Sequence, residues 1–389
     1  MSKRIDAEIA SVKSRIDRRL LLAAGGGSAL VAATPFKAWS QSRSSAFDDA
    51  LDATFEGEKP VAMAAMVLRE GTPLWSGVRG LRRFDGDVAA RVSDRWHLGS
   101  NTKAMTAALW ARQVQKGAAV WDMPLSTVMS MAFPEVMLHP DWADRTVDDF
   151  MRHRAGLYDA NYVTPLWLMS SRVSRAGLRE QRRNMLDIML RGAPNGPRGT
   201  FQYGNANYIL VGALLEGLTG QSWEELMQAD VFEPLGMSTA GFGAPAGDQP
   251  WGHLGGEGAR VSVSPDLPGS DNPKTLGPAG TVHMALEDYA RFLQAMLTPG
   301  WLSAESLQRL TTPLDGENYA MGWIVVRGQP WAKGAVLAHD GSNTLWYMST
   351  AIDLGAKLAV VSVSNDGTAG AKACPQLLGG LIRATLRTA

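Results

Sequence analysis

The sequence contains a single cysteine, Cys374, so no disulfide can form within the chain. A lone cysteine that precedes a proline is typical of a small packing residue, and we do not expect it to act as a nucleophile. The six histidines show no spacing to cysteines or carboxylates that is typical of a metal site. No glycine-rich loop leads into a Lys-Ser/Thr pair, which is the pattern that binds phosphates. We therefore expect no metal and no cofactor.

The net charge of the chain is zero, because 38 basic side chains balance 38 acidic ones. Without a basic excess the chain lacks the electrostatic signature of a nucleic-acid-binding protein, and we expect no such partner. Long apolar runs are scarce as well. Residues 20–33 are apolar but glycine-rich, and they fall short of the roughly 20 residues that span a bilayer.

That short apolar run follows the pair Arg18-Arg19 and ends in a polar stretch with small residues. Residues 1–40 are thus predicted to form a twin-arginine export signal that is cleaved near Ser40. The mature protein is then expected to be periplasmic or secreted, with no stable membrane insertion after cleavage.

The composition that is present, with 45% hydrophobic residues, predicts a sizeable core. Strand-like segments lie near both ends of the mature chain, and helical periodicity dominates between them. The predicted strands are residues 61–68, 74–81, 319–327, 335–338, 344–352 and 358–364. The predicted helices include residues 178–190, 208–218, 223–231, 286–297 and 376–386.

This order predicts an α/β fold of the α+β sandwich type, with one antiparallel sheet built from both chain ends and a helical region inserted between them. We expect one domain over residues 46–389. Its sheet region covers about 46–99 and 281–389, and its helical region about 104–280. Residues 241–280 are rich in Gly, Pro, Ser and Asp and are predicted to form a long surface loop.

The stretch from Trp96 to Leu109 draws most attention, since a glycine turn places Ser100 at the start of a predicted helix. Lys103 follows three residues later on the same helical face. A Ser-x-x-Lys pattern alone is weak, because Ser100 also reads as a helix cap and Lys103 as a solvated residue.

Two further segments carry compatible chemistry. Tyr203-Gly204-Asn205 opens a helix and offers a phenol and an amide two residues apart. His339-Asp340-Gly341-Ser342 ends a predicted strand, where a glycine permits close approach of a ligand to the backbone. Without the other motifs, we would interpret Tyr203 as a core aromatic residue and His339 as a hydrogen-bonded histidine at the end of a strand.

With these three motifs in order, the chain resembles the serine β-lactamase and penicillin-binding family, in the branch of class C β-lactamases, D-alanyl-D-alanine peptidases and related esterases. Softer matches are Phe150 to Leu157, Gly277 to Thr281 and Tyr319 to Trp323. The resemblance implies a β-lactamase/transpeptidase-like fold. It also implies a small-molecule ester, amide or peptide substrate.

By the same resemblance, Ser100 is the nucleophile, and Lys103 and Tyr203 share the acid and base work. Which of the two is the base stays open. Asn205 would orient Lys103 or the substrate amide. The backbone N–H groups of Ser100 and Ser342 would form the oxyanion hole. Trp346 and Tyr347, just past the third motif, are predicted to line the pocket, whereas His153 is predicted to be structural.

The third motif departs from the family members that hydrolyse β-lactams or D-alanyl peptides, which place a cation and a hydroxyl where this chain has His339 and Asp340, although His-x-Gly also occurs in peptidases of the family. A mostly neutral histidine and an ionised carboxylate bind a substrate carboxylate poorly, unless Asp340 points to the other side of its strand. We therefore expect a serine hydrolase that acts through an acyl-enzyme on a small ester or amide. One alternative is a β-lactamase or D-alanyl-D-alanine carboxypeptidase, and another is a non-catalytic penicillin-recognising protein.

Overall fold

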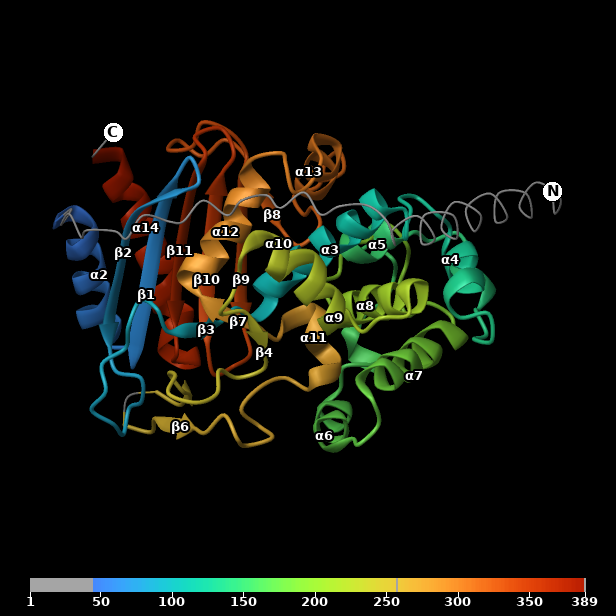
Figure 1. Cartoon of the computed structure of the whole chain (residues 1–389), viewed down its shortest axis with the longest axis horizontal. Coiled ribbons are helices and arrows are strands. Elements are labelled where there is room, and N and C mark those ends of the chain that lie inside the picture. The colour runs from blue at the N-terminus through green and yellow to red at the C-terminus, as the bar shows by residue number, and fades with distance from the viewer. Residues whose placement is uncertain (1–44, 257, 388–389) are drawn as a thin grey trace.

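A computed structural model describes residues 45–256 and 258–387. In this part of the chain a six-stranded antiparallel sheet is formed by segments from both ends (Figure 1). Its strands, in spatial order, are β2 (Thr72–Gly80), β1 (Ala62–Arg69), β11 (Leu358–Ser364), β10 (Tyr347–Asp353), β9 (Val336–Ser342) and β8 (Ile324–Val326). The predicted fold class is confirmed.

The hairpin of β1 and β2 turns at Glu70 and Gly71, which both adopt positive φ angles, of 55° and 79°. Such a two-residue turn matches the twist of antiparallel strands. Strand β1 is buried along nearly its whole length because helices cover both faces of the sheet. One face carries α2 (Ser45–Glu58) and α14 (Gly367–Arg387), whose apolar side chains form a separate core with β1, β10 and β11.

The opposite face of the sheet packs on the larger core, which includes side chains of the helical region. Figure 1 shows the helical region on this side of the sheet. The longer helices of this half are α3 (Thr102–Lys116), α4 (Leu125–Ala132), α6 (Pro165–Val173), α7 (Leu178–Arg191), α8 (Asn205–Thr219), α12 (Leu286–Leu297) and α13 (Ala304–Thr311). Shorter helical segments are α5 (Val147–Met151), α9 (Trp223–Met227), α10 (Glu233–Leu235) and α11 (Gly277–Gly280), with a π-helical segment at Gln228–Phe232.

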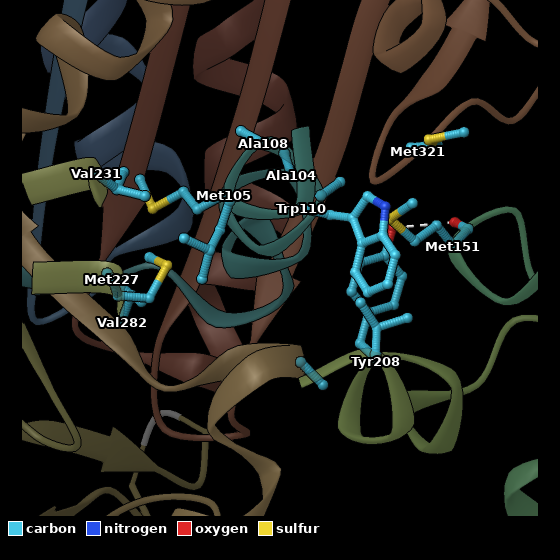
Figure 2. Close-up of a cluster of buried hydrophobic side chains, with 14 of the residues drawn as sticks. Ala104, Met105, Ala108, Trp110, Met151, Tyr208, Met227, Val231, Val282 and Met321 are labelled. Atoms are coloured by element: carbon cyan, nitrogen blue, oxygen red, sulfur yellow. Dashed lines mark hydrogen bonds between the residues drawn. The ribbon is translucent and has the colours of Figure 1, made fainter. Parts of the chain in front are cut away.

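Helix α3 runs through the middle of this core. Figure 2 shows Met105, Ala108 and Trp110 of α3 among side chains from several other elements, including Tyr208 and Met227. Residues Thr102 to Ala111 of α3 are all buried, so the first turns of the helix are enclosed on every side. The helix that starts beside Ser100 is therefore held rigidly in place.

Short strands that the sequence pattern did not predict accompany the helices. A three-stranded sheet joins β3 (Arg95–His97), β7 (Val282–Ala285) and β4 (Gly241–Phe242), and β5 (Gly252–Leu254) pairs with β6 (Val261–Val263), all within the described residues. Three of these strands, β4, β5 and β6, lie in the predicted loop over residues 241–280. Strands of two to four residues are too short to show a clear alternation, so periodicity misses them.

A buried guanidinium links three helices of the helical region. Arg182 of α7 is fully buried and pairs with Glu216 of α8 and Glu224 of α9, and it also donates to the Thr275 and Lys274 carbonyls at 3.2 and 3.0 Å. Its five N–H groups suit such a fork of acceptors.

Replacing this group by an apolar one of similar length, Arg182→Met, leaves the buried Glu216 without its cation. We expect the free energy of unfolding to fall by about 3 kcal/mol, the range for breaking a buried ion pair. Urea denaturation followed by circular dichroism measures it. The surface substitution Arg191→Met, on the same helix, serves as control. An unchanged midpoint for Arg182→Met would contradict the structural role assigned to this residue.

Within residues 45–256 and 258–387, no helix combines the length and apolar character that crossing a bilayer requires. The predicted export signal, residues 1–40, lies outside the described residues and stays a prediction.

Candidate active site

Ser100 lies in a short 3-10 turn, Gly99–Asn101, between β3 and α3. Gly99 has a positive φ of 52°, and a Cβ atom there would lie 2.3 Å from Ser342 N. A Cβ atom on Gly341 would lie 2.8 Å from Ser100 N. These two glycines allow β9 to press directly against the turn, so that the backbone amides of Ser100 and Ser342 lie near one another.

Lys103, on the first turn of α3, is fully buried and reaches Ser100. Its Nζ lies 3.0 Å from Ser100 Oγ and donates to Asn205 Oδ1 and to the Ala279 carbonyl, both at 2.8 Å. Burial lowers the pKa of Lys103 to about 7, although the nearby carboxylate of Asp159 opposes the shift. A large fraction of this amine is therefore neutral at neutral pH.

Asn205 is the first residue of α8 and is held by a carboxylate that the sequence reasoning missed. Asp159 Oδ2 accepts from Asn205 N at 2.8 Å and from Asn205 Nδ2 at 3.3 Å, and Asp159 Oδ1 accepts from Ala206 N at 2.8 Å. A carboxylate at a helix N-terminus is well placed to satisfy these free amides. It also fixes the Asn205 amide so that Oδ1 faces Lys103.

Tyr203 precedes α8 and lies against the same amine. The Lys103 Nζ atom is 4.9 Å from the centre of the Tyr203 ring. Although 36% of Tyr203 is exposed, burial around its hydroxyl raises the pKa of the phenol above its usual value, against the effect of a hydrogen bond with Ser100. The phenol therefore stays protonated at neutral pH.

His153 packs against Tyr203 and accepts a hydrogen bond from the residue that follows it. Its φ is +57°, its ring centre is 4.6 Å from that of Tyr203, and its Nδ1 accepts from Gly204 N at 3.3 Å. Burial, with the nearby charge of Lys103, lowers its pKa well below the usual value. It is thus a neutral packing and hydrogen-bonding residue, as its sequence context predicts.

His339 faces the site from β9 and is 5% exposed. Its Nδ1 lies 2.6 Å from the Asp340 carbonyl, which can only accept, so the ring proton is on Nδ1 and Nε2 faces the Tyr319 hydroxyl at 3.5 Å. Burial and the charge of Lys103 lower the pKa of His339 to about 3. The third motif therefore presents no cation at neutral pH.

The side chain of Asp340 lies on the opposite face of β9 from His339. Asp340 Oδ1 accepts from Ser349 Oγ at 2.6 Å, and Ser349 shares its face of β10 with Ala351, which packs against α14. Successive strand residues face opposite sides. The carboxylate of Asp340 is thus directed away from Ser100, and only its backbone belongs to the site.

Trp346 and Tyr347 do not line the pocket as expected. Trp346 is 1% exposed and packs edge-on against Trp96 in the core. Tyr347 lies on the α14 side of the sheet, where burial and Asp340 raise its pKa to about 12. Adjacency in sequence suggested a pocket role, but β10 begins at Tyr347 and directs both rings elsewhere. Cys374 is buried on the same side and is a packing residue, as predicted.

The softer sequence matches also converge here. Ala279 provides the carbonyl that holds Lys103, and Tyr319 faces His339. Gly322 has a positive φ of 82°, and a Cβ atom there would lie 2.5 Å from Ala104 N, so this segment packs tightly on the start of α3. Among the described residues, no group of three or more His, Cys, Asp or Glu side chains is arranged to hold a metal ion.

Comparison with known proteins gives a consistent result. The Beta-lactamase family model matches residues 47–378. The Unguisins hydrolase ungD of Aspergillus violaceofuscus is 27% identical over 251 residues, which are 62% of this chain and 42% of that protein. The Esterase EstB of Burkholderia gladioli is 25% identical, covering 87% of this chain and 95% of the esterase.

Among solved structures, the octameric penicillin-binding protein homologue from Pyrococcus abyssi superimposes with a TM-score of 0.70 at 20% identity. The match covers 88% of this chain and 77% of that one, and it concerns the fold alone. The chain spans only 42 to 62% of the length of the first three relatives found by sequence.

Proposed function

Since this chain belongs to the Beta-lactamase family, we propose that it is a serine hydrolase that forms an acyl-enzyme on Ser100 and acts on a small ester or amide. The observation that carries the proposal is the buried amine of Lys103, 3.0 Å from Ser100 Oγ, with its pKa lowered to about 7. A serine hydroxyl needs such a base to become a nucleophile.

Lys103 is the general base in this proposal. Asn205 Oδ1 and the Ala279 carbonyl can only accept hydrogen bonds, so a neutral Lys103 amine directs its two hydrogens to them. Its lone pair then faces Ser100 Oγ. As the Ser100 oxygen attacks the substrate carbonyl carbon, its proton passes to Lys103 Nζ. Burial thus supports the base by disfavouring the ammonium.

Tyr203 serves as the acid. Its raised pKa keeps the phenol protonated, so it gives its proton to the leaving oxygen or nitrogen as the bond between that atom and the carbonyl carbon breaks. The Lys103 ammonium then returns a proton to Tyr203. The amides of Ser100 and Ser342 would stabilise the developing oxyanion. Water then attacks the acyl-enzyme by the reverse proton path and releases the acid.

The neutral third motif narrows the substrate class. His339 uses both ring nitrogens within the protein and carries no charge at neutral pH, so a substrate carboxylate would find no cation there. We therefore favour uncharged esters and amides. A β-lactamase or D-alanyl-D-alanine carboxypeptidase is the second candidate, which the family supports and the third motif disfavours. A non-catalytic binding protein would have no use for the Lys103 arrangement.

A fluorophosphonate probe tests the proposal on the chain without residues 1–40. We expect labelling of the peptide that contains Ser100, and turnover of at least one of three substrates: a short-chain aryl ester, a D-amino acid anilide and a chromogenic cephalosporin. Ser100→Ala removes labelling and turnover because the nucleophile is gone, a loss on the order of 10⁴-fold or more.

The matched control is Ser126→Ala, a serine on the surface-facing start of α4 that takes no part in the site. Turnover retained by Ser100→Ala would overturn the mechanism. Turnover of the cephalosporin in preference to the ester would instead favour the second candidate.

A further inference from the structure

A buried carboxylate lies behind the Ser100 turn. Asp271, in the segment between β6 and α11, is 7% exposed, and its Oδ1 accepts from Asn343 Nδ2 at 2.7 Å. The same oxygen lies 2.9 Å from His97 Nε2, a close polar contact outside ideal hydrogen-bond geometry. His97 and Asn343 are buried as well. One oxygen atom therefore joins a residue of β3 to the residue that follows β9.

Each of these two partners is tied to one proposed oxyanion donor. His97 Nδ1 accepts from Gly99 N at 3.1 Å, and Gly99 immediately precedes Ser100. Because Nδ1 is an acceptor, the ring proton of neutral His97 is on Nε2, where it faces Asp271. Through His97, Asp271 therefore holds the turn that carries the Ser100 amide.

The other branch holds the end of β9. Asn343 follows Ser342, and its Oδ1 accepts from the amides of Leu345 at 3.1 Å and Trp346 at 3.0 Å. The Asn343 side chain is thereby fixed at both ends, between Asp271 and the turn that leads into β10. This fixes the peptide that carries the Ser342 amide.

The segment that contains Asp271 is itself anchored near the base. Arg172 of α6 donates to the Asp271 carbonyl at 3.2 Å, and Asn272 Nδ2 donates to the Gly280 carbonyl at 2.9 Å. Gly280 follows Ala279, whose carbonyl holds Lys103. One loop segment thus contacts the turn of the nucleophile, the end of β9 and the helix that supports the base.

We propose that Asp271 is a positioning residue that sets the two halves of the oxyanion hole at their working separation. The proposal rests on the proposed function. The Ser100 and Ser342 amides come from segments more than two hundred residues apart in sequence, and Gly99 and Gly341 allow these segments to meet without fixing them. The carboxylate supplies the restraint that the glycines do not, since preorganised donors stabilise an oxyanion only when they are held in place.

The test compares Asp271→Ala, Asp271→Asn and wild type on an aryl ester. Asp271→Ala frees both branches, and we expect kcat to fall about 100-fold with KM changed less than threefold, the signature of lost transition-state stabilisation. Asp271→Asn keeps an acceptor for Asn343 and is expected to restore at least a tenth of the wild-type kcat. An aryl boronic acid, which mimics the tetrahedral adduct on Ser100, should bind Asp271→Ala about 100-fold more weakly.

The control is Asp353→Ala, which removes another buried carboxylate, one that caps the hairpin between β10 and β11. It is expected to lower the melting temperature without changing kcat. Wild-type kcat and boronate affinity in Asp271→Ala would overturn the positioning role and leave the serine mechanism standing. Loss of boronate affinity no greater than in Asp353→Ala would also overturn it. A wild-type protein that neither hydrolyses the ester nor reacts with the fluorophosphonate probe would overturn both.

Discussion

Replacing Lys103 by methionine is expected to lower kcat for an aryl ester by about 10³- to 10⁴-fold, the upper range for loss of a general base. Methionine fills much of the same buried space but cannot accept the proton of Ser100. Lys103→Arg should be equally inactive, because guanidinium retains the charge and the donors yet does not deprotonate near neutral pH. Steady-state kinetics with purified proteins measures both effects.

The pH profile provides an independent check on the same residue. The active form of Lys103 is the neutral amine, and its pKa is lowered to about 7 by burial. In the wild type, kcat/KM should therefore rise tenfold per pH unit well below 7 and level off above it. The exposed Lys372→Met serves as control and should keep the wild-type profile. A profile that rises only above pH 9, or more than a tenth of wild-type activity in Lys103→Arg, would rule out this base.

Gly341→Ala is expected to abolish activity through packing alone. The added Cβ atom would lie 2.1 Å from the Leu98 carbonyl oxygen and 2.8 Å from Ser100 N, both backbone atoms that cannot swing aside. Strand β9 must therefore move away from the Ser100 turn. We expect kcat to fall at least 100-fold, as for loss of an oxyanion donor, and stability to fall by about 1 to 3 kcal/mol from overpacking.

The matched control for that variant is Gly57→Ala on α2, where an added Cβ atom meets nothing within 4 Å. This control should keep full activity and at least wild-type stability, because alanine favours a helix more than glycine does. Kinetics and thermal melting followed by circular dichroism separate the two effects. Normal kcat in Gly341→Ala would show that the close approach of β9 is dispensable.

The strongly periodic parts of the chain were predictable from sequence. The helix at Leu286–Leu297 and the strand at Leu358–Ser364 were predicted with the observed bounds, and the hairpin at 61–81 within a few residues. Of the strand predicted over 319–327, only Ile324–Val326 is observed. The preceding residues include Gly322, whose positive φ and close contact with the start of α3 do not fit an extended strand. Helices α2 and α13 were missed.

The site was predictable where motif residues lie on regular elements. The structure brings together Ser100, Lys103, Tyr203, Asn205 and His339, although their roles stay proposals. Asp340 was ambiguous because a strand residue faces one of two sides, and only the register with β10 decides which. Asp159 and Asp271 lie in aperiodic segments, where no pattern indicates which distant groups a carboxylate will meet.

The position of β11 affects how the protein can be made. This strand is the last of the sheet in sequence, yet it lies inside the sheet between β1 and β10. Until residues 358–364 are available, β1 and β10 cannot be joined, and each would present an open edge to other chains. The sheet can therefore form completely only after nearly the whole polypeptide has been synthesised. Folding that depends on such long-range contacts is slow. Ser100 is synthesised early, but the sheet that carries β9 beside it is complete only when the chain is almost finished.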